Sequence, residues 1–141
     1  METNYNIKIV DDNLTFLRDI ELFLKVRLNC EITGAYHTGE EAVENITSSY
    51  NTDIILMDIN LPGINGIVAA KRILENNRSL KIIAITQETS GIYIKSLIES
   101  GIKGILLKKD LFRELPLAID EVMNGKYHFP VQNKNYKILK S

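Results

Sequence analysis

Short apolar runs alternate along this chain with longer segments of helical spacing, and this alternation limits the possible folds more than any other feature. The short runs are rich in Ile, Leu and Val, as strands are, and cover residues 7–10, 31–36, 54–57, 81–86 and 104–108. The last three are almost continuously apolar, which favours strands covered on both faces of a parallel sheet. The pattern predicts repeated strand–helix units.

The segments between and after these runs place apolar residues at every third or fourth position, as amphipathic helices do. We expect helices over about residues 14–28, 38–46, 65–77, 90–100 and 113–124. An interior proline removes a backbone hydrogen bond, so Pro116 predicts that the last helix begins late, near Arg113. This alternation predicts an α/β fold with a doubly wound parallel sheet of five strands and five helices, in which ligands bind beyond the carboxyl ends of the strands.

Length and composition indicate one domain with its own core. The chain has 141 residues, of which 45 % are hydrophobic and 25 % charged. Its net charge of −1 gives no general attraction to nucleic acid or membranes, and its single cysteine, Cys30, excludes an intrachain disulfide. The first residues show no signal-peptide pattern, and no run of about 20 apolar residues is present to span a membrane. We therefore expect a cytoplasmic protein without membrane contacts.

Polar residues stand where four of the predicted strands end, and all of them should therefore lie on one rim of the sheet. They are Asp11 and Asp12, Asp58, Thr86 and Lys108. Each alone has an ordinary explanation as a helix cap, a turn residue or a solvated side chain. Three carboxylates at one place repel one another, however, unless protons or a cation neutralise them.

Magnesium is the cation that suits such a rim, because it prefers oxygen ligands and binds one or two carboxylates together with phosphate oxygens. Zinc is disfavoured, since neither His37 nor His128 falls on the rim. If phosphate is the substrate, an aspartate can be the nucleophile, while a lysine and a hydroxyl contact the transferred group. Asp58 is the best nucleophile, because it stands alone after a central strand and before the turn-forming pair Pro62 and Gly63.

With these residues in place, the chain resembles the receiver domain of two-component response regulators, the CheY-like family, over residues 5–126. The residues that carry the resemblance are Asp11-Asp12, Met57 to Gly66 (MDINLPGING), Ile85-Thr86 and Leu107-Lys108. It implies a flavodoxin-like fold with strand order 2-1-3-4-5, a signalling switch that is not an enzyme and has no catalytic residues, and a sensor histidine kinase or phosphotransfer protein as phosphoryl donor. It also implies the roles of the site: Asp58 as phosphoacceptor, Asp11, Asp12, Asp58 and the Asn60 backbone carbonyl as Mg²⁺ ligands, and Thr86 and Lys108 as contacts of the phosphoryl group.

Residues 100–109, 118–119 and 125–127 are similar to receivers of LuxR-type (NarL/FixJ-like) transcription regulators, in which a DNA-binding domain follows. Here we interpret residues 127–141 as a C-terminal tail that is polar from Val131 on, so we expect no output domain and no direct nucleic-acid binding in this chain. A homodimer is possible. A stand-alone receiver and a receiver fragment of a DNA-binding regulator both stay open. Ile105 occupies the switch position that is often aromatic in the family, and we expect an output surface formed by Tyr93, Ile105 and Lys109.

Three rival functions are weaker. A Mg²⁺-dependent phosphatase would need a second aspartate two residues after Asp58, where Asn60 stands. A flavin-binding module on the same fold would need a phosphate-binding loop after the first strand, and the acidic Asp11-Asp12 pair would repel flavin phosphate. A degenerate receiver that acts through protein contacts alone would lack an Asp or the Lys, and none is missing.

Overall fold

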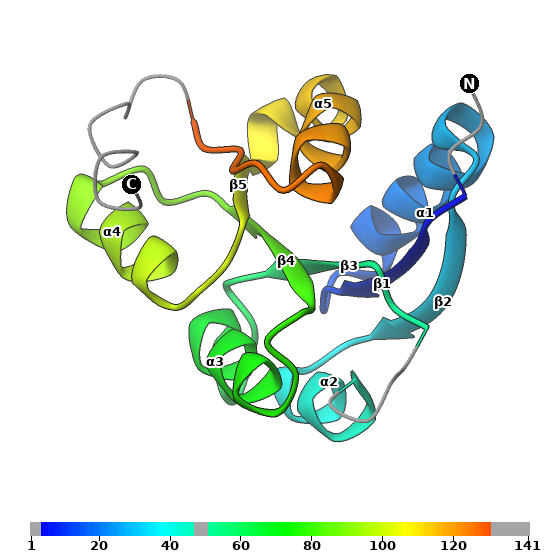
Figure 1. Ribbon diagram of the computed structural model, residues 1–141. Helices are drawn as coiled ribbons and strands as arrows, with labels where there is room; N and C mark the ends of the chain where they lie inside the picture. The colour runs from blue at the N-terminus through cyan, green and yellow to red at the C-terminus, as the bar shows by residue number, and fades with distance from the viewer. Residues whose placement is uncertain (1–3, 47–50, 131–141) are drawn as a thin grey trace.

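The computed structural model of the chain describes residues 4–46 and 51–130, and a parallel sheet forms its centre (Figure 1). The strands lie side by side in the order β2-β1-β3-β4-β5. They are β1 (Asn6–Val10), β2 (Glu31–Tyr36), β3 (Ile54–Asp58), β4 (Lys81–Thr86) and β5 (Gly104–Leu107). This confirms the predicted flavodoxin-like, doubly wound sheet. The chain reverses its direction of travel across the sheet between β1 and β3, which is where folds of this type bind ligands.

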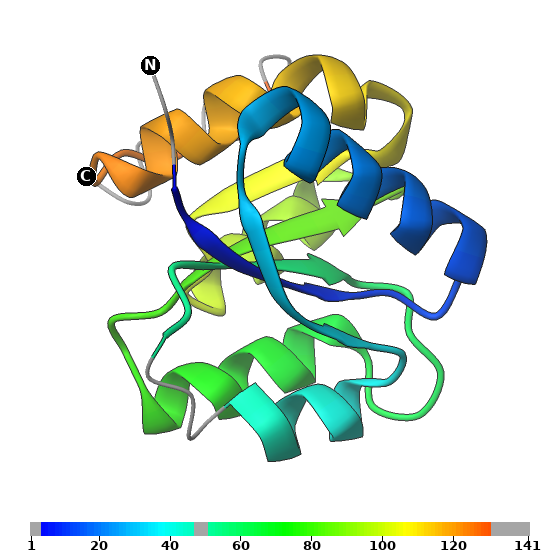
Figure 2. The same cartoon turned by 90° about the vertical axis from the view of Figure 1, so that its right-hand side faces the viewer.

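Helices cover both faces of the sheet, as Figures 1 and 2 show. One face carries α1 and α5, whose apolar residues pack with those of the sheet into one core, and the other carries α2, α3 and α4 over a second core. The helices are α1 (Leu14–Leu28), α2 (Gly39–Ile46), α3 (Gly66–Asn76), α4 (Gly91–Glu99) and α5 (Leu111–Met123), with a 3₁₀ turn, η1 (Lys108–Asp110), before α5. The central strands are therefore buried on both sides, as their continuous apolar runs predict.

Side-chain caps determine where α1, α3 and α4 begin. Asn13 caps α1 by accepting the Phe16 N–H at 3.1 Å, and Asn65 and Ser90 cap α3 and α4 in the same way. Because Asn13 comes directly after two aspartates, its cap also fixes the turn that carries them. Helix starts and the carboxyl ends of strands thus meet on one edge of the sheet.

Helix α5 begins at Leu111, earlier than the sequence predicts, so the expected start near Arg113 is wrong. Pro116 lies inside this helix. The Leu111 side chain is completely buried in the core under α1 and α5, and burying such a side chain contributes about 1.5 to 3 kcal/mol. That contribution offsets the hydrogen bond that the proline removes.

Residues 127–130 continue along the free edge of β5. The N–H of Ile105 donates to the carbonyl of His128 at 2.8 Å, the N–H of His128 donates to the carbonyl of Lys103 at 3.0 Å, and Phe129 is buried. The packed chain therefore reaches at least Pro130, while the predicted tail beyond it, 131–141, lies outside the described residues. The division at residue 126 remains a prediction. Across the described ranges, no helix combines the length and the apolar character that crossing a membrane requires.

Candidate functional site

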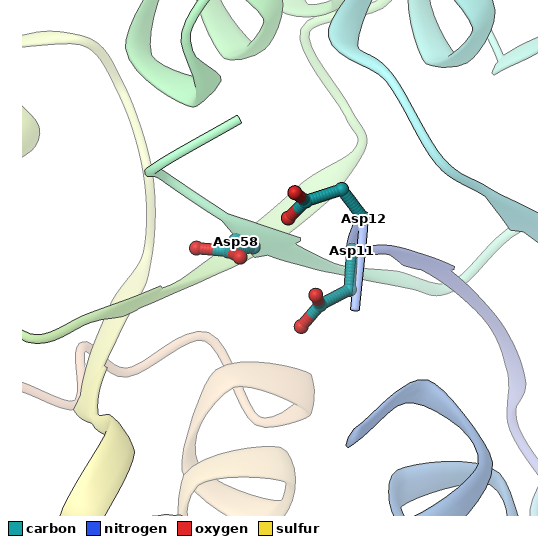
Figure 3. A group of neighbouring side chains, drawn as sticks. All are labelled: Asp11, Asp12 and Asp58. Carbon is teal, nitrogen blue, oxygen red and sulfur yellow. The ribbon is translucent and has the colours of Figure 1, made fainter. Parts of the chain in front are cut away.

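Three carboxylate side chains, Asp11, Asp12 and Asp58, meet at the carboxyl edge of the sheet (Figure 3). Each of them offers an oxygen atom that lies within 4.8 Å of those of the other two. The pairing of β1 with β3 places Val10 beside Met57, so the residues that follow these two, Asp11 and Asp58, end neighbouring strands at the same level. The rim predicted from the strand ends is therefore present for all three acids.

Asp11 is buried without enough partners for its charge. Its Oδ1 accepts the N–H of Asn13 at 2.8 Å, whereas its Oδ2 is buried and has no hydrogen-bond partner among the described residues. Burial raises the pKa of Asp11 to about 6, and the neighbouring charge of Asp58 adds to this increase. A buried oxygen without a partner, beside two further carboxylates, is an arrangement that a hard divalent cation would stabilise. The donor set, which is all oxygen, fits Mg²⁺.

One carboxylate oxygen of Asp58 accepts a backbone hydrogen bond, and the other lies near a lysine. Its Oδ1 accepts the N–H of Asn60 at 3.0 Å, which fixes the carboxylate plane. Its Oδ2 lies 3.7 Å from Lys108 Nζ, which is an ion pair and too long for a hydrogen bond. The side chain is only 2 % exposed, so a group that reacts with it must enter through the rim.

Thr86 and Lys108 lie on the other side of Asp58 from Asp11 and Asp12 in the order of the strands. Both line a cavity of about 370 Å³ between the ends of β4 and β5. Thr86 is completely buried, and its Oγ1 accepts the N–H of Glu88 at 3.0 Å. The structure thus places the polar residues predicted at the strand ends on the same edge of the sheet.

The predicted output surface is wrong in one of its three residues. Ile105 is 1 % exposed and belongs to the core under α2, α3 and α4, because both faces of β5 are covered. Lys109 is exposed. Tyr93, in the first turn of α4, interacts with the side chain of Thr86, while burial raises the pKa of its phenol. The aromatic neighbour of Thr86 therefore comes from α4 instead of β5, a contact that the cap at Ser90 allows but that sequence spacing alone does not show.

A glycine holds the loop after Asp58 in place. Gly66 opens α3, and its N–H donates to the carbonyl of Ile59 at 2.9 Å. A Cβ atom at this position would come within 2.6 Å of the Asp58 carbonyl and 2.7 Å of the Ile59 Cα, both of them backbone atoms. The loop that orients Asp58 can therefore approach α3 only because residue 66 has no side chain.

Gly66→Ala is expected to destabilise the protein by about 1 to 3 kcal/mol, because backbone must move to admit the methyl group. Gly91→Ala is the matched control, since Gly91 also opens a helix but has no atom within 4 Å of the added Cβ. This control should be neutral or stabilise by about 0.4 to 1 kcal/mol. Urea unfolding followed by circular dichroism measures both, and equal effects of the two substitutions would show that the contact with Asp58 is not restrictive.

The sheet order and the position of the acidic cluster define a flavodoxin-like α/β domain, with three carboxylates at its switch point that could hold a metal ion. The model of the response regulator receiver domain matches residues 7–120, and the chain belongs to this family. The chain is 31 % identical to the transcriptional regulatory protein DegU of Brevibacillus brevis over 88 % of its length and 52 % of that protein. It is 34 % identical to the transcriptional regulatory protein DesR of Bacillus subtilis over 86 % of its length and 59 % of that protein.

Solved structures show the same fold. A LuxR-family two-component response regulator from Aurantimonas sp. superposes with a TM-score of 0.86 at 22 % identity, covering 94 % of both chains. The non-phosphorylated receiver domain of the stress response regulator RcsB from Escherichia coli superposes with a TM-score of 0.82 at 25 % identity, covering 91 % of this chain and 99 % of that one. The chain spans a little more than half the length of the curated relatives DegU and DesR, which are transcriptional regulatory proteins by name.

Proposed function

We propose that this chain is a phosphorylation-dependent switch that accepts a phosphoryl group on Asp58 in the presence of Mg²⁺. The single observation that supports this most is the buried Oδ2 of Asp11, which has no hydrogen-bond partner in the described part of the chain and lies beside the carboxylates of Asp12 and Asp58. Three carboxylates this close repel one another, and that repulsion destabilises the fold when nothing neutralises it. A cation that binds all three, together with a phosphoryl group, would make the cluster favourable.

The ligands of the cation would be the carboxylates of Asp11, Asp12 and Asp58 and the backbone carbonyl of Asn60. When bound, Mg²⁺ supplies positive charge that neutralises these acids and the phosphoryl oxygens. Asn60 is well placed to contribute, because its N–H already donates to Asp58 and fixes the loop beside that carboxylate. The exposed position of Asp12 leaves room for water ligands, which Mg²⁺ usually keeps.

Phosphoryl transfer requires little covalent chemistry from the chain. A carboxylate oxygen of Asp58 forms a bond to phosphorus while the bond from phosphorus to the donor's nitrogen or oxygen breaks, and the donor leaves with the electron pair. The product is an acyl phosphate on Asp58. Lys108 pairs with the phosphoryl oxygens, since its ammonium group already lies 3.7 Å from Asp58. The Thr86 hydroxyl donates a hydrogen bond to the same group.

The switch follows from the new partner that Thr86 obtains. In the unmodified chain Thr86 is engaged with the N–H of Glu88 and with the side chain of Tyr93 on α4. A phosphoryl group on Asp58 competes for the Thr86 hydroxyl and so changes how the first turn of α4 is held. We therefore assign the output surface to α4 and to the η1 turn after β5, with Tyr93 and Lys109 on it and without Ile105.

Sensor histidine kinases or phosphotransfer proteins are the donors that this proposal requires. The function is signalling, with at most slow hydrolysis of the acyl phosphate, so we do not propose an enzyme. Within residues 4–46 and 51–130, every helix and strand belongs to the receiver fold. DNA binding is therefore not part of what is proposed for these residues. Homodimer formation and a cytoplasmic location remain predictions from the sequence.

Incubation with acetyl phosphate and Mg²⁺ tests the proposed function. Intact mass spectrometry should show one added phosphoryl group per chain, and chelation of the metal with EDTA should prevent the adduct, because the unneutralised carboxylates repel the anionic donor. Phosphoramidate serves as a second donor that transfers phosphorus from nitrogen. The absence of an adduct with both donors, or an adduct that is insensitive to EDTA, would contradict the proposal.

A further inference from the structure

The ammonium group of Lys108 lies over the ring of Phe16, a residue of α1 that the sequence marks only as apolar. Lys108 Nζ is 5.0 Å from the centroid of the ring, within the range of a cation–π interaction. The same nitrogen is 3.7 Å from Asp58 Oδ2. The charge of Lys108 therefore lies close both to the face of an aromatic ring and to the proposed phosphoacceptor.

Lys108 needs such a restraint because little else fixes it. Among the described residues its ammonium group has the ion pair with Asp58 and the ring contact with Phe16, and no hydrogen bond. The lysine stem has many rotamers, and the side chain is 24 % exposed, so the charge could also turn toward solvent. The Phe16 ring offers the ammonium group a second attraction, at 5.0 Å from its centroid, and this contact competes with the turn toward solvent.

The Phe16 ring is itself held by its neighbours. It packs edge-on against Phe112 with centroids 6.2 Å apart, and Phe112 packs against Phe23 at 5.2 Å. Phe112 is the second residue of α5 and follows Lys108 by four residues. The aromatic cluster therefore connects α1 to the same turn that carries Lys108, and it gives the ring a fixed position relative to that turn.

We propose that Phe16 is a positioning residue for phosphorylation, which holds the ammonium group of Lys108 toward Asp58 through a cation–π contact. The inference rests on the proposed function, because it assumes that Lys108 pairs with a phosphoryl group on Asp58. Phe16 touches neither the phosphoryl group nor the metal ligands in this scheme. It acts only by restricting where the charge of Lys108 can go.

The test is a double-mutant cycle, with the affinity for beryllium fluoride in the presence of Mg²⁺ measured by isothermal titration calorimetry. Phe16→Leu should weaken the affinity about threefold to tenfold, which corresponds to about 0.6 to 1.4 kcal/mol. In a Lys108→Ala background the same substitution should have no effect, because the charge that the ring holds is gone. Phe16→Tyr, which keeps an aromatic face, should remain close to the unmodified chain.

Phe23→Leu is the matched control. It removes a ring from the same helix and cluster, whereas the ammonium group of Lys108 lies over the ring of Phe16. It should leave the affinity unchanged. If Phe16→Leu does not fold by circular dichroism, Phe16→Met, closer in volume, takes its place in the cycle. An equal loss in both backgrounds, or no loss in either, would overturn the role of Phe16. If Lys108→Ala alone leaves the affinity unchanged, the role of Lys108 in the proposed function fails instead, and the two failures are thus distinguishable.

Discussion

Asp58→Asn is expected to abolish the phosphoryl adduct that acetyl phosphate and Mg²⁺ form with the unmodified chain. A carboxamide is a very poor nucleophile and cannot give the acyl phosphate, so the loss should be complete within detection. The substitution conserves shape, and the asparagine Oδ1 can still accept the N–H of Asn60 that Asp58 accepts at 3.0 Å. The fold should therefore survive, and circular dichroism and a urea titration confirm that before the adduct is measured by intact mass.

Asp53→Asn is the control for this experiment. Asp53 precedes β3, whereas Asp58 ends it, so the same change is made at opposite ends of one strand. The Oδ2 of Asp53 accepts the N–H of Asn6 at 2.8 Å, far along the strand from the acidic cluster. Asp53→Asn should keep full phosphorylation. A phosphoryl adduct of undiminished yield on Asp58→Asn would assign the phosphoacceptor to another residue, which fragmentation of the peptide would then locate.

The strand pattern and the edge on which the polar residues lie could both be predicted from sequence, for one physical reason. In a parallel sheet every strand ends on the same side, so a residue that follows an apolar run is already placed on the functional edge. The bounds predicted for β2 and β4 match the structure, and Asp11, Asp12 and Asp58 lie together as expected.

The contacts that the sequence did not predict depend on how helices are rotated against the sheet. Tyr93 reaches Thr86 from α4, and Phe16 reaches Lys108 from α1, and in each pair the residues are distant along the chain or in different elements. The burial of Ile105 could have been expected, because a continuously apolar strand has no solvent-facing side. Helix α5 begins earlier than expected because Leu111 is buried in the core. The expectation considered only the backbone hydrogen bond that Pro116 removes, and not this burial.

Asp11→Asn is expected to have opposite effects on stability and on metal binding. Asp11 is completely buried, its Oδ2 has no partner in the described chain, and its pKa is raised to about 6 from an ordinary value of 3.8. At pH 7 the folded protein must therefore keep a poorly solvated carboxylate ionised. A difference of about two pKa units corresponds to about 3 kcal/mol at most, and local relaxation reduces it. In EDTA at pH 7 the variant should be more stable by about 1 to 3 kcal/mol.

The pH dependence of this difference follows from the direction of the pKa shift. The folded state of the unmodified chain binds the Asp11 proton more tightly than the unfolded state does. Ionised Asp11 therefore lowers the free energy of unfolding, fully above pH about 6 and less and less as the pH falls toward about 4. Urea unfolding at pH 7, 6 and 4.5 should therefore show the advantage of Asp11→Asn shrinking. Asp12→Asn makes the same charge change at an exposed position and should stabilise much less.

Mg²⁺ should shrink the stability advantage of the variant, because an ion that binds the folded state stabilises it by an amount that grows with the logarithm of its affinity. Loss of one carboxylate ligand should weaken Mg²⁺ binding about tenfold or more. Saturating Mg²⁺ at pH 7 should then stabilise the unmodified chain more than the Asp11→Asn variant. The role of Asp11 as a ligand of the cation would be contradicted by either of two results. One is an Asp11→Asn variant that is no more stable in EDTA than the unmodified chain, and the other is a variant that Mg²⁺ stabilises as much as it stabilises the unmodified chain. The expected result would show that the buried charge of Asp11 lowers the stability of the metal-free fold and is retained because it binds the ion on which phosphorylation depends.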